Sequence, residues 1–260
     1  MFTFLIDEEL KLLQIEDLSV DIEGRRIIEG LRLIVEEGES HVLLGPNGSG
    51  KSSLLMTILG YPKYKVKTGT ILFKGVDITD LPTTDRVKLG VGILFQHPPA
   101  VRGVRLGDMI NVALGNKSEE IYTLEVTELA EELKFNSDFL ERDVNLGFSG
   151  GEVKRSEIMQ LVAQNPDFIM FDEPDSGVDV ENVELIGGVM SELLDRDKRP
   201  SARKKSGLII THLGFIMNFV KVDRAHVMLG GKIACSGDPK EIMSEIMSDG
   251  YERCVRSCQN

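Results

Sequence analysis

The stretch that decides the fold is Gly45-Pro46-Asn47-Gly48-Ser49-Gly50-Lys51-Ser52, with Ser53 directly after it. It matches the pattern G-x-x-x-x-G-K-[ST], in which glycines let successive backbone N–H groups turn inward around an anion. An apolar strand at 41–44 precedes the stretch and a helix at 51–60 follows it, so the positive end of the helix dipole points at the loop. The pattern therefore predicts a phosphate-binding loop, although a glycine-rich chain can also produce it by chance.

The chemistry of such a loop assigns a role to each part of it. The backbone N–H groups of residues 47–50 would cradle the phosphates, Lys51 would bridge the β- and γ-phosphates, and the Ser52 hydroxyl would ligate Mg²⁺. We therefore predict that Gly45 to Ser53 bind nucleotide, with ATP and Mg²⁺ as the cofactors.

A second apolar strand, at 168–171, ends in the carboxylates Asp172 and Glu173. In phosphate-loop ATPases such an aspartate holds Mg²⁺, usually through water, and the adjacent glutamate can act as general base toward the attacking water. A solvated strand end is the structural alternative. The glycine-rich loop upstream favours the functional interpretation.

Two other polar residues also follow predicted strands. Gln96, after the strand at 92–95, could complete Mg²⁺ coordination or orient water, or be a surface amide. His212, after the strand at 208–211, could face the γ-phosphate because the carboxyl ends of parallel strands meet a ligand crevice. It could equally be a satisfied structural histidine.

The segment Ser149-Gly150-Gly151-Glu152 opens a helix. Ser149 as the N-cap and Glu152 three residues later form a capping box. The same helix N-terminus could bind an anion, since two glycines allow close backbone approach. The local pattern does not choose between the two interpretations.

The apolar patterns around these motifs predict an α/β fold. Alternation in the first part of the chain indicates antiparallel strands, the apolar period nears 3.6 between 118 and 165, and strands then alternate with helix 183–194, which indicates a parallel sheet. The helix opened by Ser149 runs from Val153, and 156–163 is a further helical stretch. The predicted strands flanking these segments are 12–22, 26–35, 70–73, 208–211, 226–229 and 232–235, the last two forming a hairpin across Gly230-Gly231.

Charge and composition exclude several partners. The chain has 260 residues and a formal net charge of −12, which disfavours direct binding to nucleic acid or to an anionic membrane. Four charged residues interrupt 1–13, so no signal peptide is predicted, and the apolar stretch 207–220 is too short to span a membrane. We expect a cytoplasmic protein with no direct membrane insertion.

The three cysteines are Cys235, Cys254 and Cys258. An odd, low count fits a reducing cytosol and argues against a disulfide framework. Cys254 and Cys258 are four residues apart and would share a helix face. Without a third nearby ligand we expect them to be free thiols and not a metal site.

Taken in order, the motifs resemble the ATP-binding cassette (ABC) ATPase family. The matching residues are Gly45–Ser52, Gln96, Ser149-Gly150-Gly151, Asp172-Glu173, 175–179 and His212, which correspond to that family's phosphate loop, glutamine loop, signature, acidic strand, D-loop and histidine switch. The resemblance implies a phosphate-loop NTPase with a RecA-like parallel-sheet core, an N-terminal antiparallel β-subdomain and a small inserted helical subdomain. It implies one ABC ATPase domain over 1–260, with the core at 1–96 and 166–260 and the insert at 97–165.

The resemblance also implies a mechanism. Two copies would pair head to tail, and each would offer Ser149 and the Gly151 N–H to the γ-phosphate held by the other. Gly150 and Asp179 are also expected to bind the nucleotide. Glu173 would activate water, while Gln96 and His212 would sense the γ-phosphate. Hydrolysis to ADP and phosphate would then let the homodimer open.

Within the family the chain is similar to SufC, the ATPase of the SUF iron–sulfur cluster assembly system. The residues that carry this are G-F-S-G-G-E-V-K-R at 147–155 and D-S-G-V-D at 175–179. This implies SufB/SufD-type scaffold proteins as partners. Pro174 is more typical of transporter cassettes, so an ATPase subunit of an ABC membrane transporter stays the alternative. A module that only clamps ATP is disfavoured by Glu173.

Overall fold

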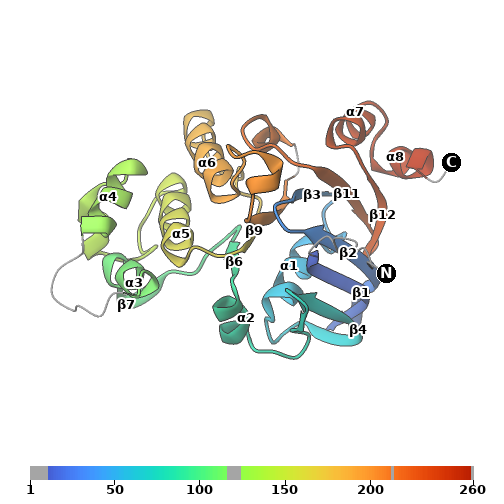
Figure 1. Cartoon of the computed structure of the whole chain (residues 1–260), viewed down its shortest axis with the longest axis horizontal. Helices are drawn as coiled ribbons and strands as arrows, with labels where there is room; N and C mark the ends of the chain where they lie inside the picture. The colour runs from blue at the N-terminus through green and yellow to red at the C-terminus, as the bar shows by residue number, and fades with distance from the viewer. Residues whose placement is uncertain (1–10, 116–123, 212–213, 259–260) are drawn as a thin grey trace, which may run out of the picture.

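The computed structural model describes residues 11–115, 124–211 and 214–258, which form two larger sheets, a two-stranded ribbon and the helices around them (Figure 1). In that part of the chain, no helix is both long and apolar enough to cross a membrane. The strands are β1 (Lys11–Ile22), β2 (Arg25–Glu36), β3 (Ser40–Leu44), β4 (Lys65–Phe73), β5 (Val76–Asp77), β6 (Val91–Leu94), β7 (Val101–Arg105), β8 (Asp143–Val144), β9 (Phe168–Asp172), β10 (Ser206–Ile210), β11 (Arg224–Leu229) and β12 (Lys232–Gly237). The helices are α1 (Lys51–Leu59), α2 (Thr83–Leu89), α3 (Leu106–Ala113), α4 (Leu124–Glu132), α5 (Gly150–Gln164), α6 (Val180–Leu193), α7 (Pro239–Asp249) and α8 (Tyr251–Cys258), with 3₁₀ turns η1 (Ser137–Glu141), η2 (Pro200–Ala202) and η3 (Phe215–Asn218).

The central sheet has six strands in the order β12-β11-β3-β10-β9-β6. All neighbours pair in parallel except the hairpin of β11 and β12. Every residue of β3, β9 and β10 is buried, because both faces of a parallel sheet are covered, and this explains their continuous apolar runs. The carboxyl ends of β3, β6, β9 and β10 therefore meet at one edge of the sheet. The predicted α/β class is confirmed.

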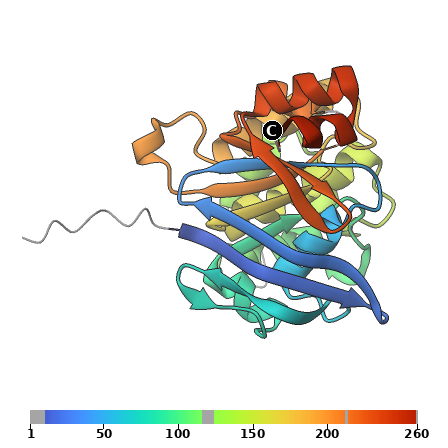
Figure 2. The same cartoon turned by 90° about the vertical axis from the view of Figure 1, so that its right-hand side faces the viewer.

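The second sheet has the order β2-β1-β4-β5 and is antiparallel. Its strands β1 and β2 run side by side over twelve residues each, with bulges that twist the pair (Figure 2). Their inward side chains pack with α1 and with one face of the central sheet in a single apolar core. This antiparallel sheet therefore covers α1 and the strand that precedes it.

Two further cores lie around the central sheet. One joins Ile169 and Phe171 of β9 to the helices α3, α4, α5 and α6. The other joins Val42 and Leu44 of β3 to α7 and α8. Successive side chains of a strand point to opposite faces. Leu43 of β3 therefore packs in the core shared with the antiparallel sheet, and Val42 and Leu44 pack in the core shared with α7 and α8. The helical segment between β7 and α5 thus shares a core with the sheet.

The structure differs from the sequence prediction at several helices. The prediction began a helix at Val153 and named 156–163 separately, whereas α5 is one helix from Gly150 to Gln164. Buried polar side chains, Lys154, Ser156 and Glu157, interrupt its apolar period and hid its extent. Helices α2, α3 and α7 were not predicted individually, whereas α8 agrees with the helix face expected for Cys254 and Cys258.

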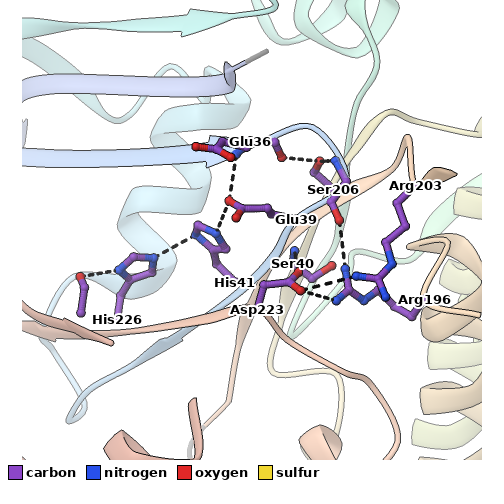
Figure 3. Close-up of polar contacts among 11 residues, drawn as sticks. Glu36, Glu39, Ser40, His41, Arg196, Arg203, Ser206, Asp223 and His226 are labelled. Atoms are coloured by element: carbon purple, nitrogen blue, oxygen red, sulfur yellow. Dashed lines mark hydrogen bonds and ion pairs between the residues drawn. The ribbon is translucent and has the colours of Figure 1, made fainter. Parts of the chain in front are cut away.

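A chain of polar contacts ties β2, β3, β11 and β12 together (Figure 3). The Glu39 carboxylate accepts from the Glu36 N–H at 3.2 Å and contacts His41 Nε2 at 2.9 Å. His41 Nδ1 lies 3.0 Å from His226 Nε2, and His226 Nδ1 lies 2.6 Å from Ser236 Oγ. Both histidines are buried, and burial, reinforced by His41, lowers the pKa of His226 to about 3.

An ion pair between buried Arg196 and partly exposed Asp223 holds the beginning of β3. Arg196 donates to Asp223 Oδ1 at 2.8 Å and to the Gly38 carbonyl at 3.0 Å, while Asp223 Oδ2 accepts from the Ser40 N–H at 2.8 Å. Arg203 adds a contact to Asp223 at 3.5 Å. Figure 3 shows these side chains converging on the start of the strand. The loop that follows β3 is therefore anchored from behind.

The expectation of free thiols holds for Cys254 and is wrong for Cys258. Cys235 of β12 and Cys258 of α8 form a disulfide with a Cα–Cα distance of 5.8 Å. The chain folds α8 back onto β12, a tertiary contact that cysteine spacing does not reveal. Cys254 keeps a free buried thiol, and burial raises its pKa to about 11.

Candidate functional site

The glycine loop, residues 45–53, joins the end of β3 to the start of α1. Gly45, Gly48 and Gly50 have φ angles of 151°, 78° and 107°. A Cβ at Gly45 would lie 2.3 Å from the Met228 carbonyl oxygen, and one at Gly50 would lie 2.8 Å from Met228 Cε. Positive φ together with this close approach explains why glycine occupies both positions.

Two side chains of the loop are held by specific partners. Lys51 Nζ donates to the carbonyls of Gly45 at 2.8 Å and Pro46 at 3.1 Å. Burial lowers the Lys51 pKa, and the nearby carboxylates oppose that effect. The Ser52 hydroxyl donates to Asp172 Oδ1 at 3.0 Å. The glycine loop and the acidic strand β9, distant in sequence, are thus in direct contact.

Asp172 and Glu173 mark the end of β9 and are both buried. Burial raises the pKa of Asp172, with a further contribution from the Glu173 charge. Glu173 has φ 51°, a left-handed conformation that non-glycine residues seldom adopt outside functional or strained sites. Its Oε2 accepts a short hydrogen bond from Gln96 Nε2. The sequence-predicted base and the sequence-predicted amide therefore touch each other.

One cavity of about 370 Å³ collects most of these predicted residues. Its lining is Asn47, Gly48, Gly50, Lys51, Ser52, Ser53, Gln96 and Glu173. Gly45, Pro46 and Ser49 are outside this lining and belong to the body of the loop, and Asp172 is reached through Ser52. The arrangement presents backbone N–H groups, the Lys51 ammonium and serine hydroxyls as hydrogen-bond donors to a single polyanion.

The oxygen donors fit a magnesium ion. The hydroxyl of Ser52, the carboxylate of Asp172 and the side-chain amide of Gln96 are the hard oxygen ligands that Mg²⁺ prefers, and Ser52 and Asp172 are already within hydrogen-bond distance. Through one or two such protein ligands an ion would be shared with substrate phosphates.

The predicted signature forms a capping box. Ser149 is the N-cap of α5: its N–H donates to Glu152 Oε2 at 2.6 Å, and its Oγ accepts from the Glu152 N–H at 3.4 Å. Gly150 and Gly151 follow in the first turn, and none of the three lines the 370 Å³ cavity. The capping interpretation is therefore confirmed, and the anion site stays a prediction.

The residue Asp179 caps the next helix, α6. Its carboxylate accepts from the Asn182 N–H and from Asn182 Nδ2, both at 2.9 Å, and Asn182 Oδ1 accepts from Arg155 of α5 at 3.3 Å. The N-termini of α5 and α6 thus form one polar edge, away from the cavity lining. His212 lies outside the described residues.

Two residues to which the sequence analysis gave no role at the site hold the glutamine segment. Lys154 Nζ donates to the carbonyls of Phe95 and Gln96, and Glu157 Oε1 accepts from the Phe95 N–H at 3.0 Å. Both side chains are buried on α5. The only hint in the sequence was the pair of charged residues Lys154 and Glu157, three residues apart and directly after the capping box. Through them α5 connects Ser149 to Gln96.

Comparisons with known proteins identify the family of this chain. Residues 28–176 match the ABC transporter family. The chain belongs to the ATP-binding cassette family. A relative described as the probable ATP-dependent transporter SufC, from Escherichia coli K12, is 36% identical over 92% of this chain and 97% of its own length. The probable ATP-dependent transporter ycf16 of Cyanophora paradoxa is 34% identical, with 94% and 95% covered.

Solved structures agree with the assignment of this cassette. MJ1267, described as an ATP-binding cassette of an ABC transporter, superposes with a TM-score of 0.75 at 25% identity, covering 95% of this chain and 98% of that one. The predicted ABC fold and the similarity to SufC are confirmed. The cassette is an ATPase, which binds nucleotide and hydrolyses ATP to ADP and phosphate.

Proposed function

We propose that this cassette works as a SufC-like ATPase: it binds MgATP in the glycine-loop cavity and hydrolyses it in a head-to-tail homodimer. The energy of that cycle reshapes a SufB/SufD-type scaffold during iron–sulfur cluster assembly. The observation that carries the proposal is the meeting of the glycine loop, Gln96 and Glu173 in one cavity. The SUF assignment is supported by the similarity to SufC over nearly the whole chain.

The roles at the nucleotide follow from the contacts. Lys51 exchanges its carbonyl partners for the β- and γ-phosphate oxygens, which the N–H groups of 47–50 also receive. Ser52, Asp172 and Gln96 would hold a magnesium ion, which would neutralise charge on the phosphates. Glu173 accepts the proton of the attacking water, while the hydrogen bond from Gln96 to its Oε2 fixes the orientation of the carboxylate. His212 senses the γ-phosphate.

In the dimer, each subunit completes the nucleotide site of the other with residues that do not line its own cavity. Ser149, Gly150, Gly151 and Asp179 lie off the cavity lining of their own chain; the first three are at the N-terminus of α5, which suits an anion, and Asp179 caps the neighbouring α6. We assign them to the nucleotide bound by a second copy. A protein of the same fold, MJ0796, is described as dimeric in a post-hydrolysis state with ADP and phosphate, at 21% identity, with a TM-score of 0.71 and 87% of this chain and 98% of that one covered.

We assign 97–165 to an inserted helical subdomain and 1–96 with 166–260 to the catalytic core, both within one ATPase domain of a cytoplasmic protein. The second candidate is the ATPase subunit of an ABC membrane transporter. It is favoured by the description of both SufC and ycf16 as probable ATP-dependent transporters. Co-purification decides between them: a SufB/SufD-type scaffold supports the first and a membrane permease the second.

The variant Glu173→Gln tests the catalytic assignment. Removing a positioned general base slows hydrolysis by roughly 10²- to 10⁴-fold, while ATP affinity stays close to that of the wild type. Phosphate release and equilibrium ATP binding are the two measurements. Glu128→Gln, an equal charge change on the exposed face of α4, is the matched control. A wild-type hydrolysis rate in Glu173→Gln contradicts the assignment.

A further inference from the structure

One arginine side chain reaches the backbone that leads into the N-terminus of α5. Arg142 follows η1, and its carbonyl accepts from the Leu106 N–H at 2.9 Å, so its own backbone is tied to the start of α3. Its Nη2 donates to the carbonyls of Leu146 and Gly147, each at 3.2 Å. The guanidinium therefore holds the chain two and three residues ahead of the cap at Ser149.

The same guanidinium lies over two phenylalanine rings. Arg142 Cζ is 4.5 Å from the ring centroid of Phe139 and 5.0 Å from that of Phe148, the residue directly before Ser149. These two rings meet edge to face with their centroids 4.8 Å apart, and buried Phe135 packs against both. A cation over an aromatic face is attracted by the ring, so this stack fixes the side chain of an otherwise exposed arginine.

The backbone held in this way is a tight turn. Asn145 and Gly147 have φ angles of 59° and 70°, both in the left-handed region, and the Leu146 N–H donates to the Asp143 carbonyl at 3.1 Å. A Cβ at Gly147 would lie 3.3 Å from Arg142 Nη2, so glycine leaves the room that the guanidinium needs. The turn and the arginine are thus fitted to each other.

The charge of Arg142 also suits the place where it lies. Glu152 brings a carboxylate to the N-terminus of α5, and this negative charge opposes the approach of a phosphate. Hydrogen bonds from Ser149 lower the pKa of Glu152, and the charges of Arg155 and Arg142 lower it further. Arg142 therefore offsets part of the Glu152 charge at the helix end that we assign to an anion.

We propose that Arg142 is a positioning residue for the nucleotide held by the second subunit. By fixing residues 146–148 it orients Ser149 and the Gly151 N–H toward that subunit's γ-phosphate. Arg142 is not part of the cavity lining of its own chain, so it acts through the signature. This inference rests on the proposed head-to-tail homodimer and adds to it a residue outside the signature.

The first test is the order of the signature in the variant Arg142→Ala. The change removes both carbonyl contacts and the stacked cation, and it leaves no cavity in the core because Arg142 is exposed. Hydrogen exchange of the Ser149 and Glu152 amides, which are bonded in the capping box, should become at least about tenfold faster. Arg102→Ala, at an exposed arginine of β7, is the matched control and should exchange as the wild type does. A wild-type exchange rate in Arg142→Ala overturns the inference.

The second test separates the role in the dimer from general damage to the fold. Sedimentation with ATP measures dimerisation of Glu173→Gln alone and with Arg142→Ala added. The added change should weaken the dimer at least about tenfold, while the ATP affinity of the monomer stays within about twofold because Arg142 is off its cavity lining. A dimer as strong as that of Glu173→Gln, or a monomer with much weaker ATP binding, overturns the inference and leaves the proposed function intact. If Glu173→Gln itself stays monomeric with ATP, the proposed homodimer fails, and faster exchange in Arg142→Ala then shows a structural role alone.

Discussion

Replacing His226 with glutamine should reduce the loss of unfolding free energy that occurs as the pH falls. The ring is 4% exposed and lies among His41, Ser236, Glu39 and Arg224, and its pKa is lowered from an ordinary 6.5 to about 3 by burial. Below pH 6.5 the unfolded chain therefore binds a proton that the folded chain does not, so stability falls as the pH falls.

The magnitude follows from that difference in pKa. Stability is lost at about 1.4 kcal/mol per pH unit below 6.5, a slope that continues down to the folded pKa near 3. Between pH 8 and pH 5 the contribution of His226 amounts to about 2 kcal/mol. Glutamine does not titrate and can still hydrogen-bond to Ser236 or His41, so the variant lacks this part of the loss.

Chemical unfolding at a series of pH values from 8 to 5 measures the effect. The quantity of interest is the difference in unfolding free energy between wild type and His226→Gln, which should shift by about 2 kcal/mol in favour of the variant as the pH falls. His97→Gln, at an exposed histidine, should leave the slope unchanged. Parallel curves for wild type and His226→Gln would refute the reasoning.

Three further changes probe the loop and its anchor. Lys51→Ala should weaken ATP binding at least about tenfold in an equilibrium assay, because Lys51 supplies the ammonium of the cavity; unchanged binding would contradict its role. Gly45→Ala should lower both the Tm and the ATP affinity, since its Cβ would lie 2.3 Å from the Met228 carbonyl oxygen, whereas Gly188→Ala, with open space, should be tolerated. Asp223→Ala should cost about 3–5 kcal/mol of unfolding free energy because it leaves buried Arg196 without its carboxylate; a loss under about 1 kcal/mol would argue against the anchor.

The sequence predicted those features whose signals are local. The glycine loop and the strand ending in Asp172 each combine an apolar run with a fixed set of polar residues, and both are where the pattern placed them. The cap at Ser149 was likewise predicted from the short spacing between Ser149 and Glu152. The extent of α5 was missed because its buried Lys154 and Glu157 bind the segment at Phe95 and Gln96, which is distant in sequence. The periodicity of apolar residues does not reveal such a contact.

Tertiary contacts account for the other omissions. The pairing of His41 with His226 depends on β3 and β11 lying side by side, which sheet order decides and residue spacing does not. The disulfide between Cys235 and Cys258 similarly depends on α8 folding back onto β12. In each case the partner is set by the fold and cannot be read from residue spacing.

The position of β3 in the central sheet has a consequence for synthesis on the ribosome. This strand leads into the glycine loop, yet its two neighbours are β10 and β11, which begin only at Ser206 and Arg224. A nascent chain lacking those segments cannot seat β3 between them, and such long-range pairing is intrinsically slow to form. Nucleotide is therefore expected to stabilise the cassette only late in translation, and a chain that terminates before Arg224 should lack one of the two strands that pair with β3.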